Sequence, residues 1–182
     1  DWTRTTLDAP VSNGGTALRF DCTRMAVFEI FMLGRADADY PPEIIKAAEL
    51  QFAKMSSDDK DRLLASIMAG LPGAYDRYSV DTLQDELAKY EGIDHVALRA
   101  NYSRFLHEIM PTADALGMRF CVHPDDPPRD ILGLPRIVSS ASDIDWVLRD
   151  VDLMANGLTL CSGSLGAGAG NDVPQIARPV AS

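Results

Sequence analysis

Apolar residues recur three and four positions apart in five segments of the chain, and this spacing is typical of amphipathic helices. Prolines and serines stand at the start of several of these segments, where they favour the first turn of a helix or cap it. The predicted helices open at Tyr40-Pro41-Pro42, at Ser56 and Ser57, at Asp81, near Asp94 and at Ser142. The fourth is the longest, and Gly117 is expected to end it because glycine readily adopts the conformation that follows a helix.

Two segments of the second half, residues 118–123 and 158–161, have the pattern of short strands. The last predicted helix lies between them, so the segment forms a strand–helix–strand unit whose strands run parallel. Residues 17–21 and 25–32 are also apolar, but their periodicity does not separate strand from helix. Loops are expected at residues 73–80 and in the glycine-rich stretch 162–170.

His123 and Cys161 are the last residues of the two predicted strands. Side chains alternate between the two faces of a strand. His123 therefore lies on the face that does not carry Phe120 and Val122, and Cys161 on the face that does not carry Leu158 and Leu160. Neighbouring parallel strands lie about 4.8 Å apart, so the two side chains can share one divalent ion. An imidazole and a thiolate suit Zn, Fe, Mn or Co better than Mg or Ca.

Two ligands make an incomplete site, because a catalytic metal usually has three protein ligands. The missing ligands would be Asp125, Asp126 or residues outside this chain. The alternative is that His123 and Cys161 are packing residues, which is the commoner role of a single histidine or cysteine in a strand.

Charge and composition narrow the class of protein. The chain has 17 Lys and Arg against 27 Asp and Glu, a formal charge of −10, which excludes a general attraction to nucleic acid or to an anionic membrane. No run of 18 apolar residues predicts a membrane span, and no signal peptide is recognisable. Three cysteines, an odd and low count, favour free thiols in a reducing compartment and hence the cytoplasm. The absence of an initiator Met suggests a fragment or a processed chain.

Several uncommon strings occur together in a fixed order. They are HPDDPP at residues 123–128, ILGLPRIV at 131–138, MANGLTLCSGS at 154–164, the opening DWTRT and GLPGA at 70–74. With these strings the chain resembles, from Asp1 to about Asp172, the mannonate dehydratase family of hexuronate catabolism.

The resemblance implies an α/β fold, a (β/α)8 TIM barrel of the xylose-isomerase-like kind. It also implies dehydration of D-mannonate to 2-keto-3-deoxy-D-gluconate in D-glucuronate catabolism, with Mn2+ or Fe2+ as cofactor. The family's metal site uses the histidine of the HPDDPP string and the cysteine of a C-[ST]-G-S motif, which correspond to His123 and Cys161. Its other two ligands, a histidine and an aspartate, and its acid–base groups lie further toward the C-terminus and have no match here.

Residues 1–182 are therefore expected to form a single partial barrel domain that is marginally stable and does not turn over substrate alone. Arg4 and Asp125 are candidate contacts to the sugar acid, no catalytic residue is assigned, and the full-length enzyme can be a homo-oligomer. One alternative is a metal-dependent sugar isomerase or epimerase on the same barrel, against which Cys161 argues because such enzymes favour carboxylate-rich metal sites. The other is a non-catalytic truncated remnant.

Overall fold

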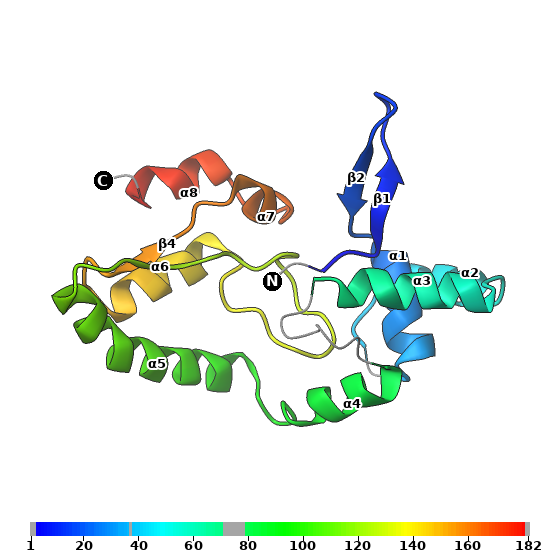
Figure 1. Ribbon diagram of the computed structural model, residues 1–182, viewed down its shortest axis with the longest axis horizontal. Coiled ribbons are helices and arrows are strands. Elements are labelled where there is room, and N and C mark those ends of the chain that lie inside the picture. The colour runs from blue at the N-terminus through cyan, green and yellow to red at the C-terminus, as the bar shows by residue number, and fades with distance from the viewer. Residues whose placement is uncertain (1–2, 37, 71–78, 181–182) are drawn as a thin grey trace. The chain divides into compact units, whose positions relative to one another are not determined.

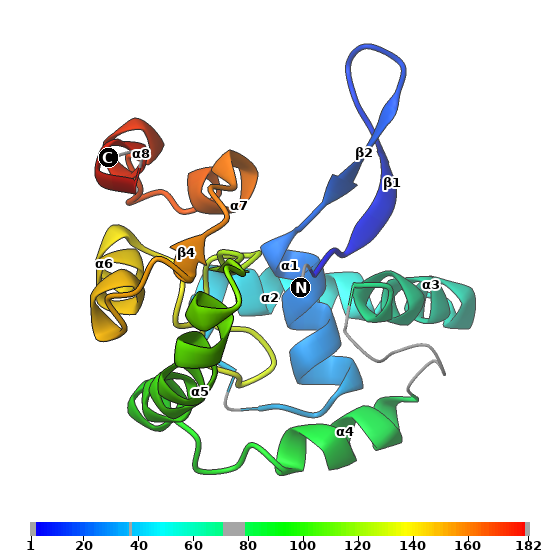
Figure 2. The same ribbon diagram turned by 60° about the vertical axis from the view of Figure 1, so that its left-hand side comes forward.

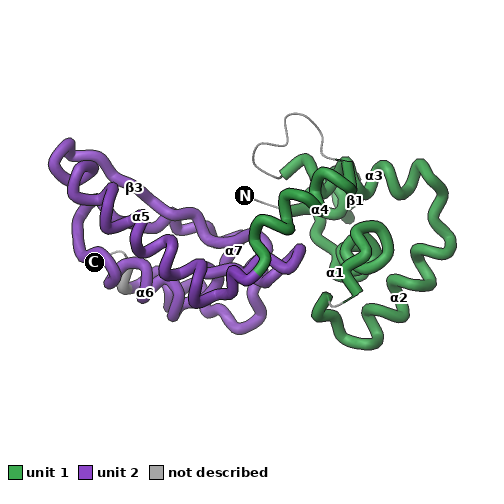
Figure 3. Tube along the Cα trace, turned by 90° about the horizontal axis from the view of Figure 1, so that it is seen from below, with its two compact units in different colours: residues 1–91 green, residues 92–182 purple. Residues whose placement is uncertain are grey.

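The computed structural model describes residues 3–36, 38–70 and 79–180, so most of the predicted loop at 73–80 lies outside the described residues. The chain divides into two compact units, residues 1–91 and residues 92–182 (Figure 3). The single partial barrel domain stays a prediction. Within the described ranges, no helix has both the length and the apolar character needed to cross a bilayer.

Unit 1 begins with an antiparallel hairpin and continues with helices (Figure 1). Its elements are β1 (Thr6–Pro10), β2 (Thr16–Arg19), α1 (Cys22–Ala26), the π-helix η1 (Val27–Met32), α2 (Pro42–Phe52), α3 (Ser57–Met68) and α4 (Val80–Ala88). The apolar segment 25–32, which the sequence left open, is helical. The side chain of Asp21 accepts a hydrogen bond from the Arg24 N–H and so caps the first turn.

The helices α2 and α3 begin where the sequence predicts them. Pro42 occupies the first turn of α2, where its missing N–H costs nothing. Ser56 caps α3 and forms a capping box with Asp59, in which each side chain accepts a hydrogen bond from the other residue's backbone.

Unit 2 is a mixture of helices with one pair of parallel strands. Its elements are α5 (His95–Ala115), β3 (Phe120–Val122), α6 (Ala141–Asp150), β4 (Asn156–Leu158), α7 (Ser162–Gly166) and α8 (Val173–Val180). β3 pairs with β4 in parallel, with Phe120 opposite Asn156 and Val122 opposite Leu158. The predicted strand–helix–strand unit is therefore confirmed, and Figure 2 shows β4 leading into α7.

Several predicted boundaries in unit 2 are wrong. The first strand comprises Phe120–Val122 rather than residues 118–123, so His123 follows the strand instead of ending it. The second strand begins at Asn156 and ends at Leu158, whereas the sequence predicted residues 158–161, so Cys161 lies beyond the strand. The cap of α6 is Ser140, because its hydroxyl and the carboxylate of Asp143 form a reciprocal capping box. The glycine-rich stretch expected as a loop contains the short helix α7.

The core of unit 2 holds the strand ends in place. Leu106 and Met110 of α5, Val147 of α6, Ala155 before β4 and Leu165 of α7 are fully or almost fully buried in one cluster. Burying such side chains is worth about 1.5–3 kcal/mol each for the larger ones. The cluster ties α5, α6 and α7 around the two strands and so fixes the residues that follow them.

Candidate metal-binding site

His123 is the first residue after β3, and its ring is oriented by its own backbone. The Nδ1 atom lies 2.8 Å from the carbonyl oxygen of Pro124. A carbonyl only accepts hydrogen bonds, so this contact puts the proton on Nδ1. In the neutral ring the lone pair then lies on Nε2, the atom through which such a histidine binds a metal.

Cys161 lies three residues beyond β4, as the N-cap residue of α7. Strand pairing continues for one residue past β4, because the Thr159 N–H donates to the Val122 carbonyl at 2.8 Å. The chain then turns into α7, which brings Ser164 beside the cysteine. The Ser164 hydroxyl donates a hydrogen bond to Cys161 Sγ at 3.2 Å.

The surroundings of Cys161 favour its thiolate. The hydroxyl and the backbone N–H of Ser164 are the main causes that lower the pKa of Cys161 from 9.0 to about 7. A hydrogen bond with the side chain of His123 lowers the pKa further, against a desolvation effect that raises it. The side chain of Cys161 makes no capping hydrogen bond at the start of α7. Ser164 and His123 therefore act mainly by stabilising the negative charge on the sulfur.

His123 and Cys161 therefore meet, as the sequence predicts, although Cys161 reaches this place from a helix cap rather than from a strand. The alternation of side chains along a strand therefore does not determine where the Cys161 side chain points. Their role as metal ligands stays a prediction.

The described residues contain no cluster of three or more His, Cys, Asp or Glu side chains that could hold a metal ion. The source of the missing ligands, whether Asp125, Asp126 or residues outside this chain, stays a prediction.

Asp125 is engaged in holding its own loop. One carboxylate oxygen accepts hydrogen bonds from the Val138 N–H at 2.7 Å and from the Ser139 hydroxyl at 2.9 Å. The other lies 3.6 Å from the guanidinium of Arg136. These contacts hold the loop, and the substrate contact of Asp125 stays a prediction.

Arg4, His95 and His107 have hydrogen-bond or ion-pair partners of their own. Arg4 belongs to unit 1, where it donates to the carbonyl of Thr3 at 2.9 Å. His95 lies 3.1 Å from Asp130, and His107 lies 3.7 Å from Asp150. Each of these exposed histidines thus lies beside a single carboxylate.

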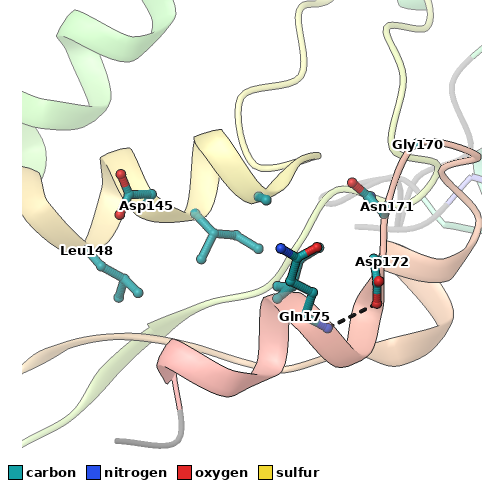
Figure 4. A pocket seen from close by; sticks show the side chains of 9 residues that line it. Asp145, Leu148, Gly170, Asn171, Asp172 and Gln175 are labelled. Atoms are coloured by element: carbon teal, nitrogen blue, oxygen red, sulfur yellow. Dashed lines mark hydrogen bonds between the residues drawn. The ribbon is translucent and has the colours of Figure 1, made fainter.

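A cavity of about 360 Å³ in unit 2 does not include His123 or Cys161 among its lining residues. Figure 4 shows it between Asp145 and Leu148 of α6 and Gln175 of α8, with Asn171 and Asp172 beside them. Its walls are largely apolar helix surface, so it is a gap between packed helices and no part of the His123–Cys161 pair.

Ser164 is the site residue that the sequence analysis missed. It is 1% exposed and stands three residues after Cys161, the spacing of a helix cap and its N3 residue. That spacing was visible in the string Cys161-Ser-Gly-Ser164, but the glycines around it favoured a loop.

Comparisons with known proteins show the family to which the chain belongs. The family model described as D-mannonate dehydratase (UxuA) matches residues 1–182. The chain is 46% identical over 180 residues to a mannonate dehydratase of Marinomonas sp. (strain MWYL1), covering 98% of this chain and 46% of the relative. It is 45% identical over 184 residues to one of Rhizobium meliloti (strain 1021), covering 100% of this chain and 46% of the relative.

A solved structure is also similar. The crystal structure of mannonate dehydratase from Streptococcus suis serotype2 matches with a TM-score of 0.60 and 26% identity, covering 97% of this chain and 37% of that chain. The chain thus spans about half the length of the curated relatives it matches, or less.

Proposed function

Because the chain belongs to the D-mannonate dehydratase family, we propose that it contributes to the elimination of water from D-mannonate, giving 2-keto-3-deoxy-D-gluconate. The protein is then a carbon–oxygen hydro-lyase of D-glucuronate catabolism that works in the cytoplasm. His123 and Cys161 supply two ligands of a divalent metal in this proposal.

The observation that carries the proposal is the placement of His123 directly after β3 and of Cys161 at the start of α7, both just past the ends of two paired parallel strands. The Pro124 carbonyl fixes the tautomer that leaves Nε2 free, and Ser164 favours the thiolate. A metal binds the thiolate of cysteine and the neutral ring of histidine, and the surroundings of Cys161 favour the thiolate. A nitrogen and a sulfur donor fit a first-row transition ion, and within that class we propose Mn2+ or Fe2+.

The reaction removes a proton next to a carboxylate and expels a hydroxyl group, so negative charge builds up on the substrate. A divalent metal supplies a Lewis acid for that charge. The chain's own residues hold the site: His123 and Cys161 as ligands, and Ser164 beside the sulfur. Arg4 remains a proposed partner for the substrate carboxylate, because a guanidinium binds a carboxylate through two hydrogen bonds.

We place β3 and β4 in a (β/α)8 barrel of the whole enzyme. The support is their parallel pairing and a site directly after the strands, since barrel enzymes keep their chemistry at the carboxyl ends of the strands. In this proposal the further metal ligands, the acid–base groups and any homo-oligomeric contacts come from the part of the full-length enzyme that lies outside the region matched by this chain.

Titration with Co2+ tests the metal site directly. Thiolate ligation gives a sulfur-to-cobalt charge-transfer band, and we expect a weak but saturable band for the chain. Cys161→Ser should abolish the band and His123→Ala should weaken binding about tenfold or more. Cys121→Ser is the matched control, because Cys121 is an exposed free cysteine of β3, and it should leave the titration unchanged. A band that persists in Cys161→Ser would overturn the ligand assignment.

The activity is tested in a full-length relative that carries the corresponding substitutions. Formation of a 2-keto-3-deoxy acid from D-mannonate should require both residues and added Mn2+ or Fe2+. An isomerised or epimerised sugar as the product would favour the alternative enzyme class. Robust metal-dependent turnover by the 182-residue chain itself would contradict the need for outside ligands.

A further inference from the structure

Unit 1 contains a cavity of about 760 Å³ that the proposed function does not use. It lies against β1, the turn after α2 and the face of α3, and its lining includes Arg24, Lys54 and Arg62. Three cations around one cavity are unusual in a chain of formal charge −10.

One of these cations is already neutralised. Arg62 lies 2.6 Å from the carboxylate of Asp59, which also lines the cavity. Hydrogen bonds from Ser56, and then from Arg62, lower the pKa of Asp59 to about 2, so the carboxylate is charged at neutral pH. The Arg62–Asp59 pair therefore adds no net charge to the cavity.

Arg24 and Lys54 have no carboxylate partner among the described residues. The Nε atom of Arg24 is buried and makes no hydrogen bond there. A buried charged donor without an acceptor is costly, and such groups commonly face a water or an ion. The carboxylate of Asp8 also lines the cavity, but one carboxylate cannot neutralise two cations.

We propose that this cavity binds a small oxyanion, either a carboxylate or a phosphate group. Arg24 and Lys54 supply the charge, and the side chains of Thr6 and Gln51, which also line the cavity, supply neutral hydrogen-bond donors. A guanidinium beside an ammonium is a common arrangement for an oxyanion, because the first gives directed hydrogen bonds and the second a point charge.

The site is testable without any assumption about the dehydratase. Inorganic phosphate and D-gluconate are titrated separately into the chain at constant ionic strength, and backbone amide shifts are followed by NMR. We expect saturable shifts at Thr6 and Gln51 for at least one anion, and the tighter anion identifies the ligand class. Absence of saturable shifts with both anions would overturn the proposal.

Variants that remove one positive charge distinguish anion binding in this cavity from a general attraction to the positive charges of the protein. Arg24→Gln and Lys54→Gln should each weaken anion binding about tenfold. The matched control is Lys46→Gln, because Lys46 is an exposed lysine of α2 that does not line the cavity. Equal losses in all three variants, or no loss in Lys54→Gln, would overturn the proposal. Lys54 is exposed, so its substitution is a fair test even if Arg24→Gln disturbs folding.

Discussion

The hydroxyl of Ser164 donates a hydrogen bond to the sulfur of Cys161 across 3.2 Å. Ser164 is 1% exposed, so water does not compete effectively for its hydroxyl. The serine thus stabilises negative charge on the sulfur of a residue that is itself only partly buried. Stabilised negative charge on an accessible sulfur is typical both of a reactive cysteine and of a cysteine that binds a metal.

We predict that alkylation of Cys161 by iodoacetamide rises through about pH 7 and then levels off. The pKa of Cys161 is lowered from 9.0 to about 7, first by Ser164 and also by His123, so the reactive thiolate forms about two pH units earlier than usual. Peptide mapping by mass spectrometry assigns the label to Cys161.

Ser164→Ala should move the midpoint of this alkylation curve to higher pH, because the strongest stabilising hydrogen bond is lost. Ser162→Ala is the control, since Ser162 is an exposed residue of the same helix. An unchanged midpoint in Ser164→Ala would show that the serine does not act on the sulfur.

Local signals predicted local structure well. Ser56 and Asp59 are three residues apart and cap α3 without help from the rest of the fold, so the sequence located that helix start. Ser140 and Asp143 have the same spacing, and this signal was available in the sequence although Ser142 was chosen. The position of a cap follows from the reciprocal pair rather than from the nearest serine.

The strand β4 was misplaced because its bounds depend on a distant partner. Asn156-Gly157 has the composition of a turn, but Asn156 pairs with Phe120, and its side chain donates to the carbonyls of Val147 and Val151. A local sequence pattern does not predict that Asn156 both begins a strand and caps the carbonyls at the end of the preceding helix. The meeting of His123 and Cys161 was still predictable, because parallel strands bring their carboxyl ends together whatever their exact length.

Asp125→Ala should lower the free energy of unfolding by about 1–3 kcal/mol, because it leaves the Val138 N–H and the Ser139 hydroxyl without their acceptor. Urea unfolding measures the change. Asp152→Ala is the control, since Asp152 is exposed. If Asp125 served only as a substrate contact, its substitution would leave stability unchanged.

Asp143→Ala should cost about 2 kcal/mol, because the carboxylate caps α6 and also binds the guanidinium of Arg99. Asp145→Ala is the matched control on the same helix, where the carboxylate makes an exposed ion pair with Arg149. Exposed pairs contribute about 0–1 kcal/mol, so the control should unfold close to the unchanged chain. Equal losses from the two substitutions would contradict the capping role of Asp143.

A buried carboxylate in unit 1 gives the last prediction. Glu29 is 2% exposed and accepts hydrogen bonds from the Tyr40 hydroxyl at 2.8 Å and from Arg35 at 2.5 Å. Tyr40→Phe removes one donor from this buried charge and should lower the free energy of unfolding by about 1–3 kcal/mol. Tyr90→Phe is the control because Tyr90 is 48% exposed, and urea unfolding should detect little change there. A loss in Tyr40→Phe no larger than in Tyr90→Phe would mean that Arg35 alone satisfies the carboxylate.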